Sequence, residues 1–140
     1  MYWGKWYEEG GVVLSDRYTT SNAVHQASKQ PEEEQAKFLQ WLYDFEYDKL
    51  GLPRPDLTIY LDVPTDFTEK LLRSREESTN TKADIHEQDM NYLATCRKTG
   101  RKAAEFYGWT VINCVKDGQM RSIEDIHEEI YRHVKNCLEG

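Results

Sequence analysis

Three short apolar segments rich in β-branched residues, separated by much longer segments, constrain the fold of this chain most. They are Val12 to Leu14, Leu57 to Val63 and Thr110 to Val115, and turn-forming residues bound each of them. Strands that alternate with long helices form right-handed crossovers and a parallel sheet covered on both faces. The sequence therefore predicts an α/β fold, a parallel sheet flanked by helices, in a single domain over residues 1–140.

The longer segments carry the apolar periodicity of helices. We expect helices from Glu32 to Leu50, from Asp84 to Tyr107 and from Ser122 to Leu138, with Ser122 as the N-cap of the last one. The turn Gly51 to Pro55 closes the first of these helices and leads into the second strand. The polar segment 73–82, RSREESTNTK, is typical of a mobile surface loop.

Composition excludes several classes of function. The 25 Asp and Glu residues outnumber the 18 Lys and Arg residues, and a net charge of −7 argues against binding to nucleic acid polymers or anionic membranes. Any bound phosphate must therefore be held by a local group of cations. The three cysteines are widely spaced, which suggests neither disulfides nor a zinc site, and no apolar run reaches the ~20 residues of a membrane span. We expect a soluble, cytoplasmic protein.

Asp16 and Arg17 follow the first predicted strand almost directly. Ligands of open parallel sheets bind beyond the carboxyl ends of the strands, so both residues lie where chemistry is expected. Neighbouring residues of an extended chain point to opposite sides, which lets one face a metal or a phosphate donor and the other an acceptor. Arginine suits a phosphate because its planar group donates two parallel hydrogen bonds. An ordinary surface ion pair is the alternative.

Two further sets of polar residues are candidates for ligand binding. Ser21 with His25, and Asn22 with Gln26, lie on neighbouring stripes of a predicted helix. The side-chain amides of Asn22 and Gln26 match the edge of a pyrimidine base. A solvated helix face has the same pattern and is the alternative. The second set is basic, and phosphoryl transfer needs such donors because its transition state spreads negative charge over oxygens. A cationic loop in water is the alternative for this set, which contains Arg73, Arg75, Arg97 and Arg101.

The motifs LSDRYTTSNAVHQ and LPRPDLTIYLDVP resemble those of the thymidylate kinase family, and the resemblance covers essentially the whole chain. It implies a P-loop NTPase fold of the nucleoside-monophosphate kinase type. It also implies that ATP and Mg²⁺ are used to convert dTMP to dTDP by an enzyme that is usually a homodimer. No nucleic acid or membrane partner is implied.

The resemblance also assigns roles to individual residues. Asp16 matches the carboxylate near the metal, and Arg17 matches the arginine that contacts both phosphates. Ser21 and Asn22 match positions beside thymine, and His25 falls where the family commonly has Tyr or Phe against the deoxyribose. Gln26 is a further expected substrate-binding residue. The resemblance also implies a lid over about 73–87, with Arg73 and Arg75 at its entrance. Asp84 and Glu87 form the acidic end of this lid, and Lys82 partly replaces an arginine of the family motif. The segment 116–121, which includes Lys116 and Met120, is implied to face adenine.

The sequence departs from the family in one large feature, because GxxxxGK[ST] does not occur in these 140 residues. The backbone and Lys of that loop normally hold the ATP phosphates, so ATP affinity is expected to be low. We expect the chain to be the C-terminal portion of a thymidylate kinase domain, and we expect Met1 to lie inside a helix of that domain. The aromatic residues Tyr2, Trp3, Trp6 and Tyr7 are then expected to be covered by further polypeptide or by a dimer partner.

The predicted function is transfer of the terminal phosphoryl group of ATP to dTMP. Two alternatives stay open. A deoxynucleoside kinase also uses an Asp-Arg motif, but it needs a carboxylate base for a neutral hydroxyl. A non-catalytic nucleotide-binding module that retains only the acceptor pocket is the alternative from another class.

Overall fold

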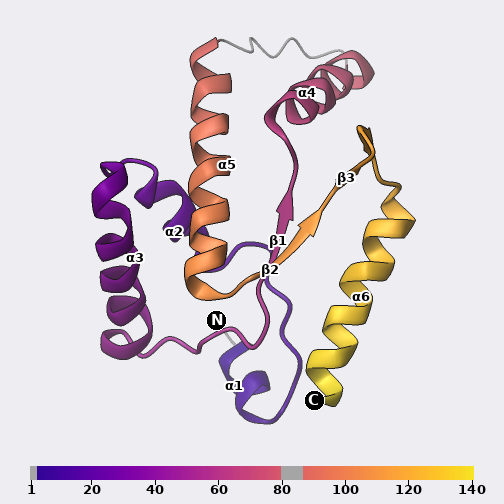
Figure 1. Ribbon diagram of the computed structural model, residues 1–140. Helices are drawn as coiled ribbons and strands as arrows, with labels where there is room; N and C mark the ends of the chain where they lie inside the picture. The colour runs from indigo at the N-terminus through magenta and orange to yellow at the C-terminus, as the bar shows by residue number, and fades with distance from the viewer. Residues whose placement is uncertain (1–2, 80–86) are drawn as a thin grey trace.

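The computed structural model describes residues 3–79 and 87–140, and Figure 1 shows its helices and strands in chain order. Short 3₁₀ and π segments, labelled η, flank one of the α-helices. The elements are α1 (Trp3–Glu8), α2 (Thr20–Ala27), η1 (Glu32–Glu34), α3 (Gln35–Tyr43), η2 (Asp44–Lys49), β1 (Ile59–Asp62), α4 (Thr65–Thr79), α5 (Glu87–Tyr107), β2 (Thr110–Asn113), β3 (Val115–Lys116), β4 (Gln119–Met120) and α6 (Ile123–Glu139).

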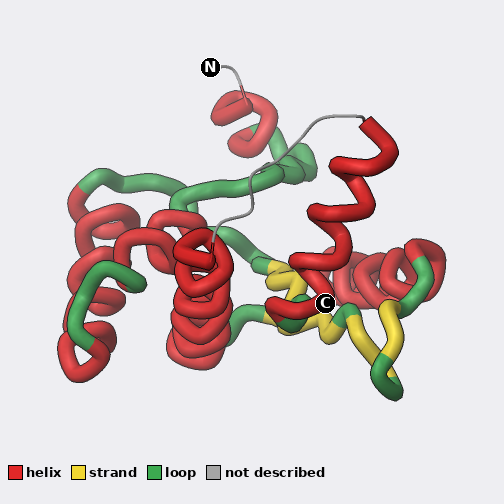
Figure 2. The backbone as a smooth tube through the Cα atoms, turned by 90° about the horizontal axis from the view of Figure 1, so that it is seen from above, coloured by secondary structure: helices red, strands yellow, loops and turns green. Residues whose placement is uncertain are grey.

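The centre of the fold is the parallel pairing of β1 with β2, which runs in register from Ile59↔Thr110 to Asp62↔Asn113. The connection between these strands passes through α4 and α5. α5 and α6 lie on opposite sides of the sheet (Figures 1 and 2), and Ile112 between them is fully buried. The predicted α/β arrangement with parallel strands is confirmed for the second and third predicted strands, although Leu61 and Val111 remain partly exposed.

The first predicted strand is wrong. Residues 12–14 form neither helix nor strand, and Val12, Val13 and Leu14 are 56%, 38% and 83% exposed. A strand needs a neighbour for its backbone hydrogen bonds, and among the described residues β1 and β2 pair only with each other. The β-branched composition of the segment therefore indicated a strand but carried no information about a pairing partner.

The predicted helix from Glu32 to Leu50 is confirmed as the continuous run of η1, α3 and η2. Leu39 and Leu42 face the core as their spacing predicts. In η2, however, Phe45 is exposed and Glu46 occupies the next buried position. Phe45 instead stacks on the exposed ring of Trp41, with ring centres 5.3 Å apart. Gly51, with φ +68°, ends this run in the left-handed conformation that glycine adopts without strain.

The predicted surface loop over 73–82 is also wrong where the structure describes it. Residues 73–79 form the last part of α4, and Arg73 pairs with Glu69 one turn earlier at 2.9 Å. The segment is rich in Arg and Glu, which are good helix formers, and the ion pair adds to that preference. Low apolar content indicated a loop, but it is equally typical of a solvated helix.

The two longest described helices agree with their predictions. α5 covers the predicted helix from Glu87 to Tyr107, and residues 84–86 lie outside the described residues. α6 begins after Ser122, whose side chain accepts a hydrogen bond from the backbone N–H of Asp125 at 3.1 Å. Both helices carry charges along their length, and no helix in the described parts of the chain is long and apolar enough to cross a bilayer.

The core is built from small side chains where helices meet. α2 packs on α5 through alanines, which allow the two backbones to approach closely. Gly100 on α5 has a similar role, because a Cβ there would collide with the hydroxyl of Tyr60 on β1. The buried cluster consists of Ala23, Ala27, Leu39, Leu42 and Ala103, with Phe38, Tyr107 and Trp109 packed against it.

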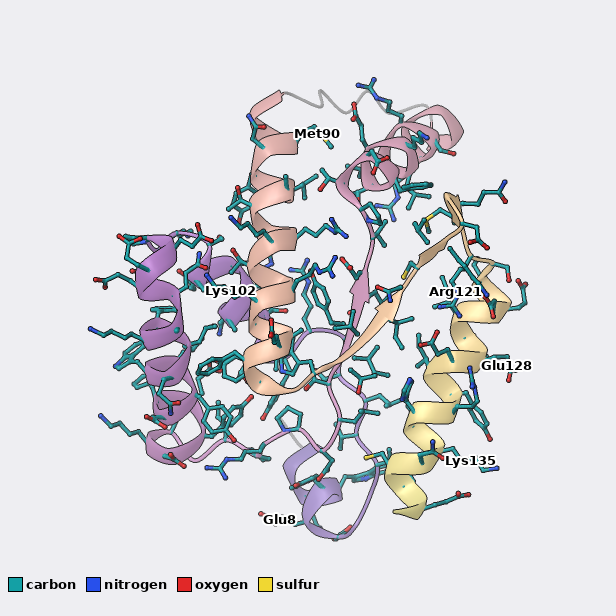
Figure 3. The ribbon with its side chains drawn as sticks, in the orientation of Figure 1. Glu8, Met90, Lys102, Arg121, Glu128 and Lys135 are labelled. Atoms are coloured by element: carbon teal, nitrogen blue, oxygen red, sulfur yellow. The ribbon has the colours of Figure 1, made fainter. Side chains whose placement is uncertain are left out.

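Arg121 connects the sheet to the last helix. It follows the β3–β4 hairpin, whose turn residues Asp117 and Gly118 both have positive φ, as this tight turn requires. Figure 3 shows Arg121 at the start of α6. Its guanidinium donates to the Asn113 carbonyl at 2.8 Å and to the carboxylate of Glu129 at 2.6 Å. The carboxyl end of β2 is therefore tied to the first turns of α6.

The N-cap of α6 yields a stability prediction. Ser122→Ala removes the acceptor for the Asp125 N–H, so the free energy of unfolding should fall by about 1 kcal/mol. Urea unfolding followed by circular dichroism measures the change. Ser74→Ala, in the exposed part of α4, is the control and should leave stability unchanged or slightly higher. Equal effects of the two substitutions would rule out a capping role for Ser122.

Candidate active site

The turn after residues 12–14 has an unusual backbone. Arg17 has φ +65°, and among the described residues Asp117 in the hairpin turn is the only other non-glycine residue with positive φ. Such a conformation costs roughly 1–3 kcal/mol and persists where the surrounding structure enforces it. The Ser15 hydroxyl donates to the Arg17 carbonyl at 2.7 Å within the turn. Asp16 and Arg17 are both exposed, so their charged groups are accessible to a ligand.

The residues that follow Arg17 are fixed by distant partners. The Tyr18 hydroxyl donates to the Pro53 carbonyl at 2.9 Å, and the hydroxyls of Thr19 and Tyr47 are 2.9 Å apart. Both partners lie in or just after η2, about 30 residues along the chain. Each such bond contributes about 1 kcal/mol, so together they are comparable with the strain at Arg17.

α2 presents the predicted polar stripe next to this turn. The helix over Thr20–Ala27 confirms that Ser21 lies one turn from His25 and Asn22 one turn from Gln26. Ala23 and Ala27 face the core, while Asn22 and Gln26 are exposed. His25 Nδ1 lies 3.4 Å from the hydroxyl of Tyr92 on α5. The structure thus brings Arg17 and the four predicted substrate-binding residues of α2 together in one continuous segment.

A charge cluster lies at the carboxyl end of β1. The Asp62 carboxylate is 3% exposed and accepts hydrogen bonds from Arg97 Nε at 2.9 Å and from a second Arg97 nitrogen at 3.3 Å. Arg101, one turn further along α5, lies 3.4 Å from the same carboxylate. Two guanidinium groups therefore face one carboxylate, which leaves this edge of the sheet locally positive. Sequence patterns indicated the two arginines but missed Asp62, although its place at the end of the strand LTIYLDV was available as a signal.

A cavity of about 200 Å³ lies between the start of α2, η2 and the chain around β1. Glu46 lines it and is only 6% exposed, and no described residue donates a hydrogen bond to its Oε2. Burial raises the pKa of Glu46, and a hydrogen bond from Thr19 opposes that rise. Sequence analysis missed Glu46, although its place four residues after Leu42 puts it on the apolar stripe of the predicted helix, where a carboxylate is unusual. Other residues that line the cavity are Thr19, Tyr43, Tyr47, Tyr107 and Trp109.

The remaining predicted site residues are not gathered around Arg17. Arg73 and Arg75 are exposed on α4, and Figures 1 and 2 show α4 and α2 on different sides of α5. Lys116 and Met120 belong to the β3–β4 hairpin rather than to a free loop. Lys82 and Asp84 lie outside the described residues, as does the side chain of Glu87, so the acidic end of the predicted lid is not described.

The described residues provide no protein cage for Mg²⁺. Within residues 3–79 and 87–140, no group of three or more His, Cys, Asp or Glu side chains converges on one point. Magnesium in phosphoryl-transfer sites is commonly held by one or two carboxylates together with phosphates and water. Asp16 alone, exposed beside Arg17, fits that sparser mode.

The Asp62 cluster generates a prediction. Asp62→Asn leaves Arg97 and Arg101 without their shared counter-charge, and the free energy of unfolding should fall by about 1–3 kcal/mol. Asp48→Asn is the control, because it breaks an exposed ion pair with Arg54 and should cost less than about 1 kcal/mol. Chemical denaturation of both variants measures the difference. A cost no larger for Asp62→Asn than for Asp48→Asn would contradict a structural role for the cluster.

The raised pKa of Glu46 predicts a pH-dependent stability. The folded protein binds this proton more tightly than the unfolded chain does, so the contribution is complete below the ordinary glutamate pKa of about 4.3. It is lost as the pH rises through the raised pKa. Glu46→Gln should therefore raise the free energy of unfolding at pH 7 by about 1 kcal/mol, with a smaller difference at pH 4. Urea unfolding at both pH values, with the exposed Glu33→Gln as control, measures it; a gain independent of pH would contradict the prediction.

Comparisons with known proteins agree with these features. The model of the family described as "Thymidylate kinase" matches residues 2–130. A thymidylate kinase of Mycobacterium tuberculosis is 33% identical over 101 residues, which are 70% of this chain and 46% of that protein. A probable thymidylate kinase of Pyrococcus abyssi is 30% identical over 138 residues, 95% of this chain and 56% of that protein. No solved structure matches this chain.

The chain spans about half the length of the curated relatives that it matches. The match nevertheless includes the turn at Arg17, the polar stripe of α2, the strand that ends at Asp62 and the arginines of α5. The family match thus covers the described site and nearly the whole chain. This chain belongs to the thymidylate kinase family.

Proposed function

We propose that this chain forms the dTMP-binding part of an enzyme that transfers the terminal phosphoryl group of ATP to dTMP. Family membership supports the proposal, and the observation that carries it is the turn at Arg17 beside the polar stripe of α2. If Arg17 binds the phosphate of dTMP, the attached nucleoside lies beside α2, where its base can contact the exposed amides of Asn22 and Gln26. An amide offers a donor and an acceptor together, as the edge of thymine requires.

The sugar is proposed to lie against His25. The contact of this imidazole with Tyr92 fixes one edge of the ring, so its flat face can pack on a deoxyribose. Ser21 lies one turn before His25 on the same stripe and is proposed to contact the base. The phosphate, sugar and base would then follow α2 from its start towards its end.

The donor nucleotide is proposed to approach from the carboxyl end of the sheet. Arg73 and Arg75 on α4 would reach its phosphates, and Lys116 and Met120 of the hairpin would lie against its adenine. Arg97 and Arg101 supply positive charge at the same edge, where Asp62 holds them. When bound, Mg²⁺ would neutralise charge on the phosphates, with Asp16 as its protein carboxylate.

The reaction needs positioning and charge stabilisation more than proton transfer. The attacking oxygen of dTMP is already anionic at neutral pH, so no general base is required. In-line attack then places the transferring group between the two nucleotides, and Arg17 donates to the oxygens on which negative charge develops. A homodimer and a cytoplasmic location are further predictions, and Trp6, 66% exposed on α1, supplies an apolar surface for a dimer partner or for further polypeptide.

The proposal predicts that Arg17 recognises the phosphate of dTMP. In calorimetric titrations, Arg17→Ala should weaken dTMP binding by about 10- to 100-fold because a charged hydrogen bond is lost, while thymidine affinity stays unchanged. Arg132→Ala, which removes an exposed arginine of α6, is the control and should bind dTMP as the unaltered chain does. In any preparation that turns over with ATP, Arg17→Ala should slow turnover by about 100- to 1,000-fold.

The outcomes separate the alternatives. Unchanged dTMP affinity in Arg17→Ala, or no dTMP binding by the unaltered chain, would refute the assignment. Tighter binding of thymidine than of dTMP would favour a deoxynucleoside kinase. Binding of dTMP together with no ATP-dependent turnover in any preparation would favour a non-catalytic module that retains only the acceptor pocket.

A further inference from the structure

The left-handed backbone of Arg17 needs a physical cause. Asp117, which shares this conformation, lies in a two-residue hairpin turn that requires it. Arg17 lies in no hairpin, since residues 11–18 form neither helix nor strand. A conformation that glycine adopts freely is strained for arginine and persists only when neighbouring contacts enforce it. The cause must therefore lie in the contacts on either side of Arg17.

Those contacts converge on one other segment of the chain. The Tyr18 hydroxyl donates to the carbonyl of Pro53, and the hydroxyls of Thr19 and Tyr47 are hydrogen-bonded to each other. Within the Arg17 turn itself, the Ser15 hydroxyl bonds only locally, to the carbonyl of Arg17. The long-range constraint on the turn therefore comes from the segment 44–53.

That segment is itself well fixed. η2 is a π-helix, a rare element that occurs frequently at functional sites. The ring of Tyr47 packs edge-on against Tyr43 with centres 4.8 Å apart. The backbone N–H of Leu52 donates to the Glu46 carbonyl at 3.1 Å, which fixes the chain just before Pro53. η2 and the turn after it thus form a rigid support for residues 18 and 19.

We propose that Tyr47 and Thr19, with Tyr18 on the Pro53 carbonyl, form an anchor that holds Arg17 in its left-handed conformation and so aims its guanidinium at the acceptor phosphate. The anchor residues are positioning residues, because they are proposed to act on the phosphate only through Arg17. The dTMP part of this inference rests on the proposed function, whereas the conformational part does not. The anchor predicts that loss of one hydroxyl frees the Arg17 turn without unfolding the protein.

The conformational part is tested by limited trypsin digestion, since trypsin cleaves after exposed arginines in mobile chain. Tyr47→Phe and Thr19→Val should each speed cleavage of the Arg17–Tyr18 bond by about fivefold, the factor that corresponds to one hydrogen bond. Cleavage after Lys29, beyond the end of α2, is the internal reference and should not change. Thr19→Ser keeps the hydroxyl and should restore the slow rate. Tyr43→Phe, whose hydroxyl lies outside the anchor, is the matched control.

The functional part is tested by calorimetry on the same variants. Tyr47→Phe should weaken dTMP binding by about fivefold. Thr19→Val should weaken it at least as much, because it removes the same bond and also the hydrogen bond to Glu46. The double variant should be no weaker than Thr19→Val alone, because that variant already lacks the Thr19–Tyr47 bond. Thymidine affinity should not change, and the free energy of unfolding should fall by no more than about 1 kcal/mol per lost hydrogen bond. A merely structural role would weaken the binding of dTMP and thymidine equally, and that result overturns the proposal.

The two tests fail separately. If the unaltered chain does not bind dTMP, the proposed function fails and the digestion still decides whether the anchor exists. If digestion after Arg17 is as slow in Tyr47→Phe and Thr19→Val as in Tyr43→Phe, the anchor is refuted even when dTMP binds. Thr19→Val provides the decision should Tyr47→Phe fail to fold.

Discussion

The parallel pairing of β1 with β2 is the constraint on which the rest of the structure depends. Parallel strands need a long crossover, and here the crossover consists of α4 and α5, which places α5 against the sheet. Because α5 lies there, Arg97 and Arg101 reach the carboxylate at the end of β1. The same helix packs on the alanines of α2, so the position of the sheet also decides where the polar stripe of α2 lies.

A second support, independent of the sheet, comes from η2. This π-helix carries Glu46 into the core and Tyr47 towards Thr19, and both contacts act on the turn that contains Arg17. Strain at Arg17 and an unsatisfied carboxylate oxygen at Glu46 are each unfavourable. Glu46 lines the cavity together with Thr19, which follows Arg17 by two residues. Local costs of this kind are expected to gather where a protein positions reactive groups, and stability is supplied by the packed core elsewhere.

Sequence patterns predicted what depends on local periodicity and missed what depends on distant partners. The helices of α3, α5 and α6 and the strands at residues 59 and 110 follow from apolar spacing and from the cap at Ser122. The segment 12–14 has strand composition, but composition carries no information about a pairing neighbour. The polar end of α4 was mistaken for a loop because helix propensity does not require apolar residues. Arg17 and α2 were predicted from their order in the chain, whereas Asp62 and Tyr47 act across more than 25 residues, which no local pattern records.

Charge shows why recognition of an anion must be local in this chain. A net charge of −7 would repel a nucleotide if all charges acted equally at every point. Exposed charges more than about 8–10 Å away are largely screened at physiological salt, so the nearest groups dominate. At the carboxyl end of β1 those groups are two guanidinium groups against one buried carboxylate. An acidic protein can therefore present a locally positive edge although its net charge is negative.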